Sequence, residues 1–235
     1  MFRYPKIQTL FKRDSNFKVI NEYRVKSLLY VKNILIMEKI DGTNAQIELV
    51  YRKPDVILSI FSRNNLIYSE INGTALISND DIMYIKETIF KKVNLTKLRK
   101  WYFENFCLEE KSITVRLFGE VYGKGINTGY KYSNNRDIRI FDIQINNNFI
   151  SFYKVFNICE QLELKTVPII YQGESKDLSY EAIRYLLIEN EKTNKTLINE
   201  GGAGGYLEGF IIKSEPLLLD EYGERVMAKI KREDF

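Results

Sequence analysis

The sequence predicts an α+β fold with a largely antiparallel strand core, and two patterns support this prediction. Apolar and polar residues alternate in several short stretches, as they do in half-buried β-strands. Between these stretches lie longer segments whose apolar residues recur every three or four positions, as they do in amphipathic helices. Strands interrupted by helical segments suggest α+β architecture. At 235 residues the chain is long enough for one substantial core, so we expect a single domain over residues 1–235.

The first half of the chain holds three predicted strands and a helical region. Strands are expected at residues 34–39, 43–51 and 56–61, the first two joined by the short step Ile-Asp-Gly. From residue 80 to residue 106 the apolar positions follow a helical period, which predicts one or two helices. Asn79 and Asp80 stand just ahead of this region, where polar side chains cap helix N-termini.

The second half returns to strands, beginning with residues 112–122. There Val115, Leu117 and Val121 share one face while Arg116 and Glu120 share the other, so Glu120 points away from the more apolar face. Further strands are predicted at 137–145, 167–171, 206–214 and 225–231, and helices at 153–164 and 178–191. The glycine-rich stretches GKGIN (123–127) and EGGAGG (200–205) predict loops, because neither has the spacing of a phosphate-binding P-loop.

Composition excludes several classes of chemistry. The sequence contains no histidine, which removes histidine-based acid and base catalysis and imidazole metal sites. Cys107 and Cys159 lie far apart, as expected of structural thiols in a reducing compartment, with a disulfide as the alternative. No signal peptide or long apolar stretch is present, so we expect a cytoplasmic protein without a membrane partner. Richness in Ile, Asn, Lys and Tyr fits an AT-rich genome, such as that of a virus or phage.

Charged residues interrupt strands in which a simple core strand would carry none. They occur in EKIDGTN (38–44), SRN (62–64), LFGEVYG (117–123), IRIFDI (138–143), EGFIIKS (208–214) and AKIKR (228–232). Each short motif has an ordinary structural explanation: KxDG alone is commonly a surface turn with an exposed lysine, and charges near the C-terminus commonly lie on a solvated edge. The occurrence of all six in one order favours a shared function.

In this order, and with YPKIQTLFKRD near the N-terminus, the motifs resemble those of the covalent nucleotidyltransferases, which comprise polynucleotide ligases and capping enzymes. The closest resemblance is to ATP-dependent RNA ligases of the RNA ligase 2 type, and it spans Glu38 to Lys231. It implies a nucleotidyltransferase, ATP-grasp-like domain built on mostly antiparallel sheets with flanking helices.

The resemblance also implies a catalytic set. Lys39 would attack the α-phosphate of ATP and form a lysyl-adenylate, while Lys229 and Lys231 would contact that phosphate. A lysine nucleophile must be neutral, and because the ordinary lysine pKa is about 10.4 it needs neighbouring cations that disfavour its charged form. Lys229 and Lys231 offer such cations from one face of a strand. Glu208 would organise Mg²⁺ or Mn²⁺ through water, since Mg²⁺ keeps several of its waters.

The implied nucleotide site contains nine residues: Glu38, Ile40, Asn44, Arg63, Glu120, Phe141, Lys213, Lys229 and Lys231. In it Arg63 would hold the ribose or phosphates, Glu120 the ribose hydroxyls, and Phe141 would stack on adenine. An exposed loop arginine and an ordinary core aromatic are the alternatives for Arg63 and Phe141. Glu208 and Lys213 are five residues apart, which places them on opposite faces of a regular strand unless a bulge intervenes or Glu208 precedes the strand.

By resemblance the protein is an ATP-dependent RNA ligase. It would transfer AMP from Lys39 to the 5′-phosphate of an RNA, most readily in a nicked duplex, and join that end to a 3′-hydroxyl; we expect a monomer. Asp41 favours the alternative of a DNA nick ligase, because many close RNA ligases carry histidine there. A GTP-using capping enzyme and a non-catalytic RNA-binding domain are further alternatives. The chain stops four residues after Lys231, as a minimal ligase or an excised catalytic domain would.

Overall fold

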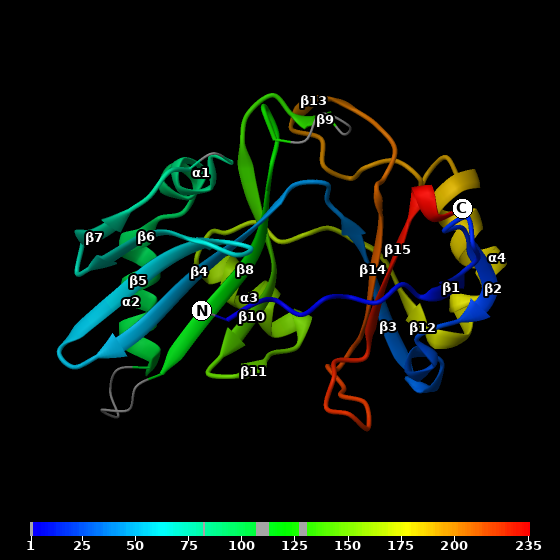
Figure 1. The fold of residues 1–235 in the computed structure, drawn as a ribbon, viewed down its shortest axis with the longest axis horizontal. Helices are drawn as coiled ribbons and strands as arrows, with labels where there is room; N and C mark the ends of the chain where they lie inside the picture. The colour runs from blue at the N-terminus through cyan, green and yellow to red at the C-terminus, as the bar shows by residue number, and fades with distance from the viewer. Residues whose placement is uncertain (1, 82, 107–112, 127–130) are drawn as a thin grey trace. The chain divides into compact units, whose positions relative to one another are not determined.

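The computed structural model describes residues 2–81, 83–106, 113–126 and 131–235, and it divides the chain into two compact units. The first unit comprises Met1–Tyr4, Gly42–Asn127 and Asn135–Thr166, and the second comprises Pro5–Asp41, Thr128–Asn134 and Val167–Phe235. Each has its own main antiparallel sheet, as the ribbon in Figure 1 shows. The α+β prediction is therefore confirmed, while the expectation that both units act as one domain stays a prediction.

The first unit is built on a seven-stranded sheet in the order β11-β10-β8-β4-β5-β6-β7. The strands are β4 (Thr43–Arg52), β5 (Asp55–Ser62), β6 (Leu66–Ile71), β7 (Thr74–Ser78), β8 (Thr114–Tyr122), β10 (Asp137–Ile145) and β11 (Asn148–Phe149). The strands predicted around β4, β5, β8 and β10 are confirmed; the residue 112 included in that prediction lies outside the described residues. The sequence analysis missed β6 and β7. All five residues of β7 are exposed, so its sequence carries no alternating burial pattern.

Three helices complete the first unit: α1 (Ile85–Lys92), α2 (Leu95–Phe106) and α3 (Phe152–Gln161). Tyr102 ties α2 to the sheet, because its buried hydroxyl accepts a hydrogen bond from the Tyr51 N–H at 2.7 Å and donates to the Ile113 carbonyl. The predicted helical region thus forms two helices, separated at Val93 and Asn94.

The predicted cap of the first helix was placed at the wrong residues. Asp81, rather than Asn79 or Asp80, accepts hydrogen bonds from the N–H groups of Ile85 and Glu87, at 2.7 and 3.0 Å. Asn79 instead donates its side-chain amide to the Leu66 carbonyl at 2.9 Å. The cap therefore depends on the path of the chain before α1, which residue type alone does not reveal.

The second unit is built on a four-stranded sheet in the order β12-β3-β14-β15. Its strands and the smaller pairs around it are β1 (Phe11–Arg13), β2 (Val19–Tyr23), β3 (Asn33–Lys39), β9 (Lys131–Ser133), β12 (Ile169–Glu174), β13 (Gly201–Gly204), β14 (Gly209–Ser214) and β15 (Met227–Lys231). Its helical segments are η1 (Lys26–Tyr30), η2 (Ser175–Leu178), α4 (Tyr180–Arg184), η3 (Tyr185–Glu189) and η4 (Arg232–Asp234). The predicted strands near β3, β12, β14 and β15 and the predicted helices near α3 and α4 are confirmed.

One face of this sheet forms the core of the second unit. Ile36, Phe210 and Ile230 come from three adjacent strands, and they are fully buried in one cluster with Leu178 and Leu187. Burying this apolar surface stabilises the sheet by about 25 cal/mol per Å² removed from water. Because side chains alternate along a strand, residues one position away from this set belong to the opposite face.

The loop prediction at residues 200–205 was wrong for its central part. Gly201–Gly204 forms β13 and pairs with β9, although the pairing shifts between Gly201 and Gly204. Those two glycines have φ angles of 78° and 69°, in the left-handed region that favours glycine. A strand built in this way has no apolar alternation, so no local sequence pattern predicts it. At 123–127, Gly123–Ile126 forms the predicted turn, and Asn127 lies outside the described residues.

Cys159 is a free thiol in α3, and burial raises its pKa to about 12. This agrees with a structural thiol, while the disulfide alternative involves Cys107, which lies outside the described residues. Among the described residues no helix has both the length and the apolar character needed to span a bilayer.

Replacement of Asp81 by alanine tests the cap. We expect Asp81→Ala to lower the free energy of unfolding by about 1 kcal/mol, because the N–H groups of Ile85 and Glu87 lose their acceptor. Urea denaturation measures this change. Asp80→Ala is the matched control and should leave stability unchanged; a larger loss for Asp80→Ala than for Asp81→Ala would contradict the assignment.

Candidate active site

The register of three strands places Lys39 and Lys231 in one row. Lys39 at the end of β3 is paired with Gly209 at the start of β14, and Gly209 is paired with Lys231 at the end of β15. A Cβ atom on residue 209 would lie 2.2 Å from the Ile230 carbonyl oxygen, so only glycine allows this approach of β14 and β15. The row therefore brings two ammonium groups to the same end of the sheet.

Glu208 lies between these two ammonium groups. Lys39 Nζ donates to both of its carboxylate oxygens, at 2.7 and 2.6 Å, and Lys231 Nζ lies 3.2 Å from Oε1. The Glu208 side chain is 9% exposed, against 22% for Lys39 and 27% for Lys231, so the carboxylate is covered while both amines reach solvent. Three of the four predicted catalytic residues thus form one cluster.

Glu208 precedes β14, which begins at Gly209, and this resolves the conflict over its spacing with Lys213. Lys213 occupies the same face as Lys39, because it pairs with Leu35, four residues before Lys39 on β3. The Lys213 side chain is buried, and it lies four residues further along β14 than Gly209, the partner of Lys39. Both assignments are therefore geometrically compatible, and the phosphate role of Lys213 stays a prediction.

Lys229 stands in the row between Lys39 and Lys213. It pairs with Ile211 and, two residues before Lys231, shares its face. Burial lowers the pKa of Lys229, and the positive charges of Lys39, Lys231 and Arg13 lower it further. For Lys231, burial lowers the pKa, but the hydrogen bond to Glu233 and the charges of Glu208 and Glu233 outweigh it and raise the pKa overall. One face of the sheet therefore concentrates positive charge that is only partly compensated by carboxylates.

Glu38 lies on the opposite face of β3 from Lys39. Its buried carboxylate accepts hydrogen bonds from the Thr196 hydroxyl at 2.5 Å and from the Leu197 N–H at 3.0 Å. Next to Lys39 on the other side, Ile40 is also buried. These contacts fix the backbone around the lysine, and the predicted nucleotide contacts of Glu38 and Ile40 stay predictions.

The remaining predicted residues belong to the first unit. Asn44 on β4 pairs with Glu120 on β8, so these two polar residues are adjacent and half-buried. Phe141 lies where the pairing of β10 with β8 shifts, and its ring meets the Tyr4 ring edge-on at a centroid distance of 5.1 Å. Arg63 is exposed just after β5. Their predicted roles toward the nucleotide stay predictions.

Gly42 shows why the KxDG motif carries glycine. A Cβ atom there would lie 2.4 Å from the Val121 carbonyl oxygen and 2.7 Å from Glu120 Cγ. Only glycine lets the start of β4 approach β8 this closely, so the motif glycine supports the pairing that holds Asn44 opposite Glu120.

Four residues that support the site were missed by the sequence analysis: Arg13, Tyr132, Thr196 and Asp234. The hydroxyl of buried Tyr132 accepts a hydrogen bond from the Asp41 N–H at 2.9 Å, two residues after Lys39. Burial and the nearby carboxylates of Glu38, Glu208 and Asp41 raise the pKa of Tyr132, which keeps it neutral. Nothing in the sequence separates it from the other 15 tyrosines.

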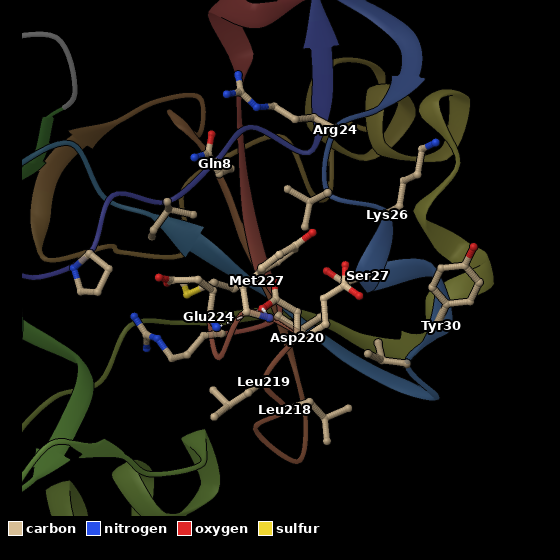
Figure 2. A pocket seen from close by; sticks show the side chains of 18 of the residues that line it. Gln8, Arg24, Lys26, Ser27, Tyr30, Leu218, Leu219, Asp220, Glu224 and Met227 are labelled. Atoms are coloured by element: carbon tan, nitrogen blue, oxygen red, sulfur yellow. Dashed lines mark hydrogen bonds between the residues drawn. The ribbon is translucent and has the colours of Figure 1, made fainter.

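A large groove in the second unit is a separate feature (Figure 2). It has a volume of about 1040 Å³ and is lined by residues 5–8, 24–27, 30–31, 218–222 and 224–227. Its walls carry Lys6, Arg24, Lys26 and Arg225 together with Asp220, Glu221 and Glu224. With four cations against three carboxylates it offers little net attraction for a polyanion. None of the four predicted catalytic residues lines it, so we place the candidate active site at the Lys39 cluster instead.

The two lysines of β15 should titrate in a defined order. We expect Lys229 to lose its proton at lower pH than Lys231, because burial and three neighbouring cations disfavour its charged form while Glu208 and Glu233 favour that of Lys231. Reductive ¹³C-methylation followed by an NMR pH titration measures both, with Lys229→Arg and Lys231→Arg to assign the signals. In Lys39→Met the Lys229 signal should move to higher pH; the reverse order of the two lysines would contradict the described charges.

No curated protein matches the sequence, but solved structures share its fold. An archaeal ATP-dependent RNA ligase is similar with a TM-score of 0.60 at 12% identity, over 100% of this chain and 49% of that one. A Naegleria gruberi RNA ligase solved with pyrophosphate gives 0.53 at 16% identity, over 97% and 61%. A putative ATP-dependent DNA ligase from Aquifex aeolicus gives 0.54 at 17% identity, over 97% and 49%. This chain thus spans 49% to 61% of the length of these three proteins.

The fold is accordingly that of ligase nucleotidyltransferase domains, as the motifs predict. In addition, the family model described as RNA ligase matches residues 32–231. This range contains Lys39, Glu208 and Lys231, which form the cluster, and Lys229, which lies on the same face of the sheet. The chain belongs to the RNA ligase family.

Proposed function

We propose that this chain is the adenylyltransferase part of an ATP-dependent RNA ligase and that Lys39 is its nucleophile. The observation that carries the proposal is the contact of Lys39 Nζ with both carboxylate oxygens of Glu208, in the same row as Lys231. A surface lysine with no chemical task would not need contact with a buried carboxylate and a glycine that permits the row. The ordinary alternative for KxDG, an exposed turn lysine, also disagrees with the 22% exposure of the side chain.

In the proposed first step the Lys39 Nζ attacks the α-phosphate of ATP. A P–N bond forms, the bond between the α-phosphorus and the bridging oxygen breaks, and pyrophosphate leaves with the electron pair. Nζ must lose a proton before or during attack, and Glu208 is a carboxylate within hydrogen-bond distance of it. Lys229 and Lys231 face the same side and would stabilise the charge that develops on the α-phosphate.

Glu208 is also the residue that would hold Mg²⁺ or Mn²⁺ through water. Among the described residues no group of three or more Asp, Glu or Cys side chains is arranged so that it could hold a metal ion. A single carboxylate fits a metal that keeps its waters and shares substrate phosphates, and such a metal would neutralise phosphate charge. A Naegleria gruberi ligase variant solved with ATP and Mn supports this cofactor set.

The rest of the nucleotide site is proposed from the motifs. Glu120 beside Asn44 would bind the ribose, and Phe141 would stack on adenine while Arg63 holds ribose or phosphate oxygens. Glu38, Ile40 and Lys213 complete the set, the first two by fixing the strand end and the third by contacting phosphate.

The proposed substrate is an RNA with a 3′-hydroxyl and a 5′-phosphate, in a nicked duplex. AMP passes from Lys39 to the 5′-phosphate, and the 3′-hydroxyl then attacks that phosphate and releases AMP. The family assignment and the similar RNA ligase structures support RNA. A monomeric state and a cytoplasmic location stay predictions.

A DNA nick ligase is the second candidate, and two observations favour it. The first is Asp41, which stands where many close RNA ligases carry histidine. The second is the similar Aquifex aeolicus structure, which is described as a putative ATP-dependent DNA ligase. A non-catalytic RNA-binding domain is disfavoured, because binding alone does not require a lysine in contact with a buried carboxylate.

Intact-mass spectrometry after incubation with ATP and Mg²⁺ tests the nucleophile. The wild type should gain the mass of one AMP group, and Lys39→Ala should gain none, because no amine then faces Glu208. Lys32→Ala, an exposed lysine just before the same strand, is the matched control and should gain AMP. A wild type freed of bound adenylate that gains nothing with ATP or GTP and either Mg²⁺ or Mn²⁺ would refute the enzyme proposal.

Sealing assays distinguish the two substrates. We expect the adenylylated protein to join nicked duplex RNA faster than nicked duplex DNA of the same sequence, because the family is that of RNA ligases. Gel separation of labelled strands measures both rates under single-turnover conditions. Faster joining of DNA would favour the alternative that Asp41 suggests, and Asp41→His would then be the variant to compare.

A further inference from the structure

The C-terminal turn η4 contacts the reaction centre through two backbone groups. The Lys231 N–H donates to Asp234 Oδ2 at 2.8 Å, and the Arg232 N–H donates to the Glu208 carbonyl at 2.7 Å. These bonds fix the backbone of two residues in the proposed catalytic cluster. The position of Lys231 therefore depends on where the Asp234 side chain is held.

Asp234 is held by Arg13. Its side chain is only 3% exposed, and its other oxygen, Oδ1, accepts a hydrogen bond from the Arg13 guanidinium, 221 residues earlier in the chain. The same N-terminal segment also pairs with β15: the Lys229 N–H donates to the Gln8 carbonyl and the Leu10 N–H donates to the Lys229 carbonyl, each at 2.8 Å. One short segment thus fixes the backbones of both β15 lysines.

This ion pair joins a carboxylate whose side chain is 3% exposed to a guanidinium whose side chain is 33% exposed. Removing the Asp234 charge from water offsets much of the attraction between the two groups, whereas hydrogen bonds between charged groups are short and directional, so the pair contributes more to geometry than to net stability. Its position against the Lys231 N–H indicates a second task.

We infer that Arg13 and Asp234 act together as positioning residues for Lys231 and Lys229 during adenylylation. The inference rests on the proposed function and extends it, because the resemblance assigns no role to either residue: Arg13 lies in the N-terminal stretch YPKIQTLFKRD, and Asp234 follows the last motif, AKIKR. Asp234 acts through the Lys231 N–H, and Arg13 acts through Asp234. Neither is assigned a contact with the nucleotide.

The turn has other anchors, so the charge of Asp234 can be removed while the turn stays folded. Arg232 donates its guanidinium to the Leu187 carbonyl at 2.8 Å and lies over the Tyr206 ring at 4.1 Å. Phe235 packs against Tyr180 at a ring-centroid distance of 5.3 Å. Loss of the carboxylate should therefore loosen Lys231 without releasing the whole turn.

The two positioning residues have opposite electrostatic effects on Lys229. The charged groups that act on it are Lys39 from β3, Lys231 from β15, Arg13 from β1 and Asp234 from η4. After burial and the two lysines, Arg13 lowers the pKa of Lys229, while Asp234 raises it. Removing Arg13 should thus raise this pKa, and removing Asp234 should lower it.

The experiment is single-turnover self-adenylylation at saturating ATP, for Arg13→Met, Asp234→Asn and the double variant. Each single variant should lower the rate about tenfold, because a displaced Lys231 stabilises the transition state less, while the ATP concentration for half-maximal rate stays within about twofold. The double variant should be no slower than the worse single variant. The pH above which the adenylylation rate falls should be higher in Arg13→Met and lower in Asp234→Asn than in the wild type.

A neighbouring ion pair supplies the matched control. Lys12 is next to Arg13 on β1, and it pairs with Glu22 on the adjacent strand β2. Both side chains are about half exposed, and in the described part of the chain their pair contacts neither β15 nor η4. Lys12→Met and Glu22→Gln should keep the wild-type rate. If Arg13→Met or Asp234→Asn fails to fold, Arg13→Lys and Asp234→Glu replace them, with a several-fold lower rate expected from the altered hydrogen-bond geometry.

Folded variants that adenylylate at the wild-type rate with the wild-type pH profile would overturn the inference. If the wild type itself forms no adenylate, the proposed function fails, and the inference is then judged by the lysine NMR titration. In that case an altered Lys231 signal in both Arg13→Met and Asp234→Asn would support the positioning role. An unchanged Lys231 signal in these variants would refute it.

Discussion

The close pairing of three backbones at Lys39, Gly209 and Lys231 is the constraint on which the candidate active site depends. Because residue 209 has no side chain, β14 and β15 approach at this row, and Glu208 just before it reaches both ammonium groups. Because side chains alternate between the two faces of each strand, this row then determines which other residues share the face of Lys39. Lys229 and Lys213 join the same face, and Ile36 and Phe210 turn to the core.

This arrangement contains a balance between stability and reactivity. Lys39 Nζ donates hydrogen bonds to both oxygens of Glu208, whereas the proposed attack needs an amine with a free electron pair. On the same face, burial lowers the pKa of Lys229, and the positive charges of Lys39, Lys231 and Arg13 lower it further. ATP would bring negative charge to this face, so we expect substrate binding to change the partners of all three lysines.

The sequence predicted the strands of the site well, because alternation and charged interruptions are both local patterns. It placed Lys39 at the end of one strand and recognised that Glu208 could precede another, which the structure bears out. It failed where a contact depends on the path of the chain: the cap from Asp81 in place of Asp80, and the pair of Arg13 with Asp234. No local pattern links residues 221 positions apart, and only the folded sheet brings them together.

The central claim is that one particular lysine of the cluster carries the adenylate. Proteolysis of the protein after incubation with ATP and Mg²⁺, followed by tandem mass spectrometry, locates the modified residue directly. We expect AMP on Lys39 alone, because this lysine contacts both oxygens of Glu208, while Lys229 and Lys231 are proposed to bind phosphate from the same face of the sheet. AMP on Lys229 or Lys231 with Lys39 unmodified would contradict it.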